Sequence, residues 1–150
     1  MVVDAPAPAP AALDWPWSGA APTEDSGTTD VRYALSGDTA LGEWYINGEQ
    51  WPDVTIQEIP RDLYAILEVR NISPTEHPFH LHGLPMEVLS LDGVAPEVRT
   101  VEDTVNIPIY GVLRARVLAD LPGDWMAHCH LLPHAEGGMM TVLRVGDELR

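Results

Sequence analysis

The chain has 150 residues, 45% of them hydrophobic and 21% charged, which are the proportions of a globular protein with one domain. Its net charge is −15, and all eight basic residues are arginine. Nucleic acid and anionic membrane surfaces are therefore excluded as partners, because both bind positively charged surfaces. A single cysteine excludes an internal disulfide, and no segment approaches the roughly 20 apolar residues of a membrane-spanning helix.

Residues 1–30 are rich in proline and alanine and contain five acidic residues but no basic one. They show neither a helical nor a strand period, so we predict an extended arm or linker, followed by one folded domain over residues 31–150. Trp15 and Trp17 are the exception, and we expect them to pack on a surface of this chain or of a neighbour. The first residues lack the basic and apolar regions of a signal peptide, which indicates a mature, truncated or recombinant chain.

From Val31 onward, apolar and polar residues alternate with a period of two, which is typical of half-buried strands. Turn residues separate the runs at 36–38, 47–48, 60–62 and 92–93, and the Asn-Gly pair at 47–48 predicts a tight hairpin. The predicted strands cover residues 31–35, 44–51 as a hairpin, 54–59, 63–70, 86–91, 98–107, 112–119, 125–130 and 140–145. No segment has a helical period. The sequence therefore predicts an all-β fold, an antiparallel Greek-key sandwich or barrel of about eight strands.

All six histidines lie in two short segments, HPFHLHG at residues 77–83 and AHCHLLPHAEGGMM at residues 127–140. Successive side chains on a strand point to opposite faces, so His128 and His130 share one face while Cys129 points to the other. The chain then breaks at a proline and turns through two glycines, which lets His134 and Met139 fold back toward the sulfur. One strand is thus expected to serve two sites.

The first histidine segment has the same alternation. His80 and His82 share a strand face, whereas His77 is an odd number of residues from both and can point the other way. The pattern predicts one site with a thiolate, two imidazoles and a thioether, the ligand set of a blue-copper centre. Its members are His77, Cys129, His134 and Met139. The opposite face carries His80, His82, His128 and His130.

Simpler interpretations exist for each part. A lone cysteine is commonly an inert buried thiol, and one pair of histidines two residues apart on a strand can hold zinc or nickel in any protein. Two such pairs, each beside a member of a plausible blue-copper set, favour copper. Asp103 and Glu76 are candidates to orient ligating imidazoles, although solvation of the surface is the more ordinary role of each.

The two segments resemble the third and fourth copper motifs of the multicopper oxidases, the laccase family. The resemblance extends through WYINGEQWPD, VEDTVNIP and PGDWM, and covers roughly residues 30 to 146. It implies a cupredoxin fold and copper as the cofactor. The implied ligands are His77, Cys129 and His134 with axial Met139 for type 1 copper, His80 for type 2 copper, and His82, His128 and His130 for the type 3 pair. Met140 is then a core residue.

The resemblance also implies a function. A reducing substrate, phenolic or a metal ion, would give electrons to the type 1 copper, which would pass them through Cys129 to His128 and His130 and to a trinuclear site that reduces dioxygen to water. The family builds that site from eight histidines in four His-x-His pairs, and this chain has two pairs. We therefore expect a second cupredoxin domain or a homo-oligomer, such as a two-fold dimer, to complete it. The alternative is a stand-alone blue-copper electron-transfer protein with no oxidase activity.

Two further expectations concern the cellular location of the protein and the charge of its substrate. The family resemblance suggests a periplasmic or secreted protein. The strong acidity is either an ordinary solvated surface or a means of favouring cationic or neutral substrates.

Overall fold

The computed structural model describes residues 21–146, so the prediction for Trp15 and Trp17 lies outside the described residues. One sheet has six strands: β1 (Val31–Asp38), β2 (Glu43–Ile46), β4 (Tyr64–Asn71), β6 (Met86–Leu91), β7 (Thr100–Glu102) and β9 (Val112–Leu118). The other has five: β3 (Gln57–Pro60), β5 (His77–Leu81), β8 (Thr104–Ile107), β10 (Gly123–Cys129) and β11 (Met140–Gly146). A short helix, α1 (Leu132–Glu136), connects β10 to β11.

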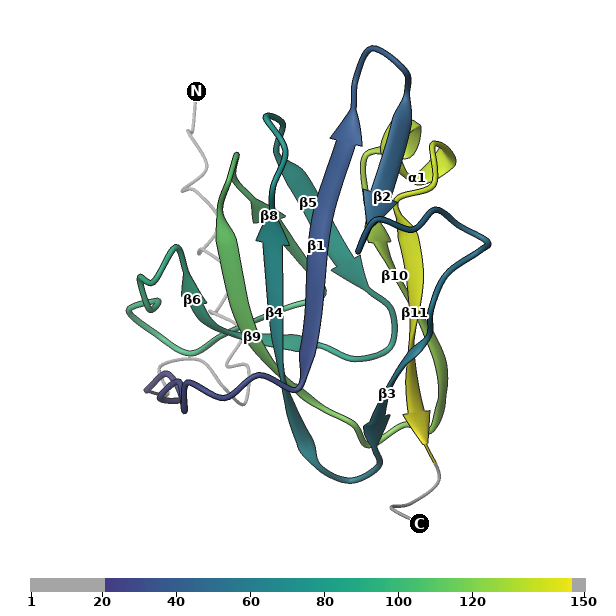
Figure 1. Cartoon of the computed structure of the whole chain (residues 1–150). Helices are drawn as coiled ribbons and strands as arrows, with labels where there is room; N and C mark the ends of the chain where they lie inside the picture. Colours follow the sequence, from purple (N-terminus) through teal and green to yellow (C-terminus); the bar gives the residue numbers. More distant parts are fainter. Residues whose placement is uncertain (1–20, 147–150) are drawn as a thin grey trace, which may run out of the picture.

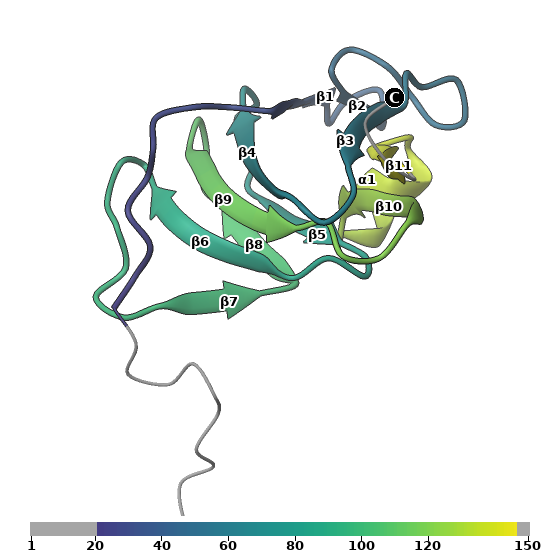
Figure 2. The same cartoon turned by 90° about the horizontal axis from the view of Figure 1, so that it is seen from below.

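The two sheets form a β-sandwich (Figures 1 and 2). The strand order is β2-β1-β4-β9-β6-β7 in the first sheet and β3-β11-β10-β5-β8 in the second. The predicted all-β sandwich is therefore confirmed, and the arrangement is that of a cupredoxin. Within residues 21–146, no helix is long and apolar enough to cross a membrane.

The structure differs from the sequence prediction in the pairing of strands. Both sheets are mixed, because β1 pairs with β4 and β3 pairs with β11 in parallel. The predicted single strand over residues 98–107 is two strands, β7 and β8, which belong to different sheets. The described residues hold eleven strands instead of about eight, and α1 was not predicted. The side-chain period identifies strands but carries no information on which strand is the neighbour.

The predicted turns are partly confirmed. At residues 47–48 and 92–93 both members of each pair have positive φ, with values of 57° and 76° and of 53° and 77°. This is the backbone that two-residue hairpin turns require. The turn predicted at 36–38 is wrong, because β1 continues to Asp38 and the chain reverses only after it.

The core fills the space between the sheets. In β1 the side chains of Val31, Tyr33 and Leu35 point inward and are at most 1% exposed, while their neighbours face outward. Tyr33 packs against Phe79 of the facing sheet with ring centroids 5.7 Å apart. Cys129 is also fully buried and belongs to this core. The end of β10 therefore delivers a thiol into an apolar environment.

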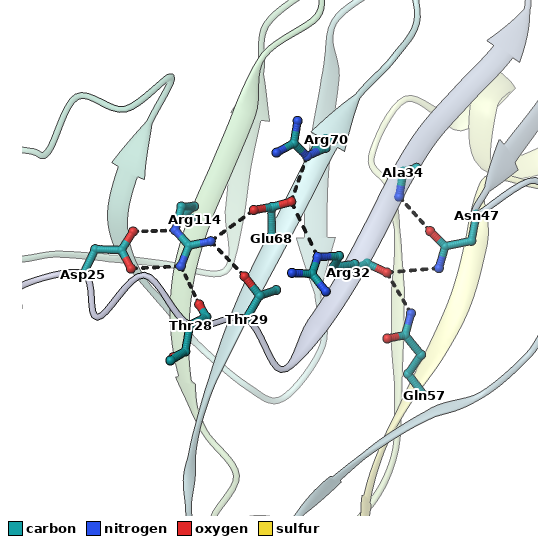
Figure 3. A network of polar contacts seen from close by, with 10 residues as sticks. All are labelled: Asp25, Thr28, Thr29, Arg32, Ala34, Asn47, Gln57, Glu68, Arg70 and Arg114. Atoms are coloured by element: carbon teal, nitrogen blue, oxygen red, sulfur yellow. Dashed lines mark hydrogen bonds and ion pairs between the residues drawn. The ribbon is translucent and has the colours of Figure 1, made fainter.

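Residues 21–30 lie against the outer face of the six-stranded sheet (Figures 2 and 3). Asp25 forms an ion pair with Arg114 of β9, and the Thr23 hydroxyl donates a hydrogen bond of 2.6 Å to Glu87 of β6. Arg114 also contacts Glu68 at 3.1 Å, which joins this segment to β4. The second part of the predicted arm thus packs on the domain, and the boundary at residue 30 remains a proposal.

The ionisation of Glu87 makes the stability of this face depend on pH. It is 4% exposed and pairs with Arg116 at 2.6 Å and with Arg99 at 3.1 Å. Burial by itself raises the pKa of Glu87, but hydrogen bonds from Arg99, Thr23 and Arg116 outweigh it and lower the pKa from 4.5 to about 2. A lowered pKa means that ionised Glu87 stabilises the fold above pH 4.5 and that this contribution is lost as pH falls toward 2.

We therefore expect Glu87→Gln to lower the free energy of unfolding at pH 7 by about 2 kcal/mol. We also expect it to flatten the loss of stability below pH 4.5, because Gln does not titrate. Urea unfolding at a series of pH values measures both effects. Glu102→Gln, a change at an exposed carboxyl on the neighbouring strand, is the control. The prediction would be contradicted by a Glu87→Gln variant whose free energy of unfolding falls below pH 4.5 as steeply as that of the wild type.

Candidate metal centre

Three of the predicted type 1 ligands meet at one end of the sandwich. His77 begins β5, Cys129 ends the neighbouring β10, and His134 lies in α1. The Cys129 Sγ is 3.7 Å from His77 Nδ1 and 3.6 Å from His134 Nδ1, and the two Nδ1 atoms are 3.1 Å apart. Bonds of about 2.0 to 2.3 Å to one ion place neighbouring N and S donors about 3 to 4 Å apart. The donor types and their spacing therefore fit a single metal ion.

The loop after Cys129 is closed on the cysteine by backbone hydrogen bonds. Pro133 is placed in the first turn of α1, where its missing N–H is not needed. The N–H of Met139 donates to the carbonyl of His134 at 2.9 Å, and the N–H of Cys129 donates to the carbonyl of Met139 at 3.2 Å. Gly138, with φ of 104°, makes the reversal between them. This loop brings His134 back to a cysteine five residues earlier.

The two neighbouring methionines are separated by strand pairing. Met140 is the partner of His128 across β10 and β11, so it faces the same side as that histidine. Met139 bonds through its backbone to Cys129 and is fully buried, whereas Met140 is only partly buried. Met139 is thus on the Cys129 side, and the expectation that Met140 is a core residue is corrected.

Burial determines the charge state of these ligands. It lowers the pKa of His77 to about 4, with a smaller contribution from the nearby His134. Burial also lowers the pKa of His134, and it raises the pKa of the Cys129 thiol despite a hydrogen bond from the backbone of Leu131. The metal-free site at neutral pH therefore holds two neutral imidazoles and a protonated thiol. Binding of a metal would release the thiol proton.

His77 is oriented by residues that the sequence reasoning missed. The Ser73 hydroxyl donates to Asn71 Oδ1 at 2.8 Å and lies 2.7 Å from His77 Nε2. Because its proton is directed to Asn71, the hydroxyl accepts from His77 Nε2–H and leaves Nδ1 free to bind a metal. Asn71 is itself fixed by its amide, which donates to the carbonyls of Thr75 and Pro108. The signal available in the sequence was the Asn-Ile-Ser-Pro turn before His77.

The other four histidines lie on the opposite face of β5 and β10. The Nε2 atoms of His82 and His128 are 3.0 Å apart, and the ring of His80 is 4.6 Å from that of His82 and 5.4 Å from that of His128, between centroids. Ligand atoms of these three residues all lie within 4.8 Å of one another. His130 is exposed, with its ring centroid 5.5 Å from that of His80. Three of the four residues predicted to bind type 2 and type 3 copper therefore converge, and the fourth, His130, lies beside them.

Two of these rings have a fixed tautomer. The Thr104 hydroxyl donates to Asp103 at 2.8 Å and so accepts from His80 Nδ1–H at 2.8 Å. The Nδ1–H of His128 donates to the carbonyl of Cys129 at 2.9 Å. Both Nε2 atoms are then free to bind a metal. Asp103 thus acts through Thr104, whereas Glu76 contacts the Asn106 amide, so the structure places Glu76 away from the ligating rings.

Cys129 connects the two sites. Its side chain points to the first site, and its chain neighbours His128 and His130 belong to the second. A β-sandwich with a buried thiol and two imidazoles at one end of the core, and a histidine cluster on the opposite face of the same strand, defines a copper-binding protein of the cupredoxin class.

Comparison with known proteins identifies the family. Residues 24–148 match the family model described as multicopper oxidase. Multicopper oxidase MmcO of Mycobacterium tuberculosis is 34% identical over 116 residues, which is 77% of this chain and 22% of that protein. Copper resistance protein A of Pseudomonas syringae is 31% identical over 117 residues, 78% of this chain and 19% of that protein. The chain therefore belongs to the multicopper oxidase family, whose cofactor is copper.

Solved structures give the same result for the fold. The multi-copper oxidase from Pseudomonas thermotolerans matches with a TM-score of 0.73 at 27% identity, over 97% of this chain and 36% of that one. The enzyme from Pediococcus acidilactici matches with a TM-score of 0.72 at 27% identity, over 85% of this chain and 28% of that one. The chain thus spans about a quarter to a third of the solved oxidases it resembles, and about a fifth of the relatives above.

Proposed function

We propose that His77, Cys129, His134 and Met139 hold a type 1 copper that accepts electrons from a reducing substrate. The observation that carries the proposal is the buried Cys129 Sγ within 3.7 Å of two Nδ1 atoms that are free to bind a metal. Copper bound there would supply one-electron oxidation and reduction. A thiolate with two imidazoles and a distant thioether selects copper over zinc, because zinc prefers four comparable ligands in a tetrahedron.

The second part of the proposal concerns where the electrons go. Cys129 is joined through its own backbone to His128 and His130, so a short covalent path leads from the first site to the histidine face. We assign His80 to type 2 copper and His82, His128 and His130 to the type 3 pair. Free Nε2 atoms on His80 and His128 support this assignment.

The trinuclear site needs a second source of histidines. The described residues supply two His-x-His pairs, and the family pattern requires four. We propose that a second cupredoxin domain or a second subunit supplies the rest, and that the completed site reduces dioxygen to water. The reducing substrate would be a phenol or a metal ion. The relatives carry names as different as copper resistance protein A and L-ascorbate oxidase, so the names point to no single substrate for the family.

A second candidate function is electron transfer without oxidase activity. One asymmetry favours it: this chain supplies all four proposed type 1 ligands, but only two of the four His-x-His pairs in the family's trinuclear cluster. In that case the type 1 copper would exchange electrons with another protein or a small molecule, and the four histidines on the opposite face would take no part in electron transfer.

Copper content and mass in solution distinguish the two functions. If the chain is an electron-transfer protein, the copper-loaded sample will be a monomer with one copper per chain and will consume no oxygen. If it assembles into an oxidase, we expect a dimer or larger complex with one type 1 ion in each subunit, a shared three-ion cluster, and oxygen consumption with a phenolic donor. Light scattering, metal analysis and an oxygen electrode give the answer. A chain that binds no copper at all would refute both.

A further inference from the structure

The two imidazoles of the type 1 site are oriented by different means. His77 is fully buried, and its Nε2 is bonded to Ser73. His134 is only partly buried and lies in a five-residue helix with no buried residues. Among residues 21–146, no group forms a hydrogen bond with the Nε2 of His134. A ring without that bond can rotate about its Cβ–Cγ bond and turn Nδ1 away from the metal position.

An indole ring takes the place of the missing hydrogen bond. Trp44 of β2 stacks on the imidazole of His134 with ring centroids 3.6 Å apart and an interplanar angle of 22°. The same indole lies at an angle of 75° to His77, with centroids 5.6 Å apart. We infer that Trp44 is a positioning residue of the copper centre: its stack fixes the ring of His134 and keeps Nδ1 directed at the metal. This inference rests on the type 1 site proposed above.

Trp44 is itself held rigidly. It is 3% exposed, and its backbone N–H donates to the carbonyl of Gly137 at 3.0 Å, next to α1 (Figure 1). Two glycines make room for the indole. A Cβ on Gly37 would lie 2.1 Å from the Trp44 ring, and a Cβ on Gly137 would lie 2.6 Å from it. These contacts are closer than real Cβ atoms tolerate. The position of Trp44 therefore requires Gly37, and Trp44 together with the carbonyl of Gly42, 2.5 Å from the same Cβ position, requires Gly137.

The stack has two physical effects on a bound metal. Aromatic contacts of this kind contribute beyond burial and favour the stacked ring orientation about 2- to 12-fold. The indole also covers one face of the imidazole and keeps water from it. Because water stabilises the more highly charged cupric state, loss of this cover should lower the reduction potential of the copper. Loss of orientation should weaken copper binding.

The test compares three variants with the wild type. Trp44→Leu keeps an apolar side chain but removes the stack, and we expect its copper affinity to fall about 10- to 100-fold, as for other residues that orient ligands. We expect its reduction potential to fall and its visible band to shift. Trp44→Phe keeps a smaller aromatic face and should lie between Trp44→Leu and the wild type. Trp125→Phe is the matched control, because Trp125 packs on Gly83 and not on the type 1 ligands.

A second route perturbs the stack without changing the tryptophan. Gly37→Ala places a methyl group against the indole and should displace it, with copper affinity and potential changing in the direction seen for Trp44→Leu. If Trp44→Leu fails to fold by circular dichroism, Trp44→Phe and Gly37→Ala decide the question. Folded variants with wild-type copper affinity, visible spectrum and potential would overturn the inference.

One measurement on the metal-free protein separates this inference from the proposed function. The indole ring current should shift the proton resonances of the His134 ring, and that shift should disappear in Trp44→Leu. A wild-type protein that shows the shift but forms no blue centre would refute the type 1 site and with it the positioning role. An unshifted His134 ring in a protein with a blue centre would refute the positioning role alone.

Discussion

Replacing Cys129 with serine should abolish the intense visible absorption band and the narrow hyperfine splitting of the copper-loaded protein. Both signals come from the bond between a thiolate and cupric copper, and Cys129 is the single cysteine of the chain. Serine is nearly isosteric, so the fold should persist, and the loss is expected to be complete rather than partial. Absorption and electron paramagnetic resonance spectra of the two proteins at equal copper loading give the result.

The neighbouring methionines provide the control for this experiment. Met139→Leu should keep the visible band but shift it, because the thioether on the Cys129 side is the proposed axial ligand. Met140→Leu should leave the band unchanged, because Met140 pairs with His128 and faces the other side of β11. A Cys129→Ser protein that stays blue, or equal shifts from both methionine variants, would contradict the ligand assignment.

A cationic electron donor should reduce the type 1 copper about 10- to 1,000-fold faster than an anionic donor of equal potential at low salt. The net charge of −15 is the first reason. The distribution of the arginines is the second: five of the eight form ion pairs on the outer face of the six-stranded sheet. Near the proposed centre, Glu43 and Glu136 are exposed beside Trp44 and His134.

Stopped-flow reduction of the copper-loaded protein over a range of ionic strength measures this effect. The advantage of the cationic donor should shrink as salt rises, because surface charges are screened beyond about 10 Å at 0.1 M salt. Glu136→Gln should reduce the advantage more than Glu102→Gln, a change of equal charge on β7 at the edge of the other sheet. Equal rates for the two donors at low salt would exclude electrostatic steering.

Several features of the site could be predicted from the sequence because they depend on local geometry. A strand directs consecutive side chains to opposite faces whatever surrounds it. The alternation at residues 128–130 therefore separated Cys129 from His128 and His130. The structure places Cys129 and His128 on opposite faces of β10, and His130 directly after this strand with its ring near that of His80. The all-β class and the turns at 47–48 and 92–93 followed from the same short-range rules.

Other features depended on contacts between residues far apart in the chain. The parallel pairs, β1 with β4 and β3 with β11, and the division of residues 98–107 between two sheets are decided by how apolar faces pack, which a period of two does not encode. The family resemblance pointed to Met139 as the ligand, but only the partner of Met140 across the sheet showed that Met140 faces the side of His128.

The orientation of the ligands belongs to this second group. The sequence by itself determined which residues carry metal-binding atoms and, for the strand residues His77, Cys129 and His128, toward which face each one points, because these follow from residue type and strand parity. Only the tertiary structure placed Ser73 against His77 and Trp44 against His134. Trp44 is 90 residues before the imidazole on which it stacks, and such a contact exists only once β2 and α1 lie together at one end of the sandwich. The physical reason is that a ring's orientation is set by the atoms packed around it, and these come from all parts of the chain.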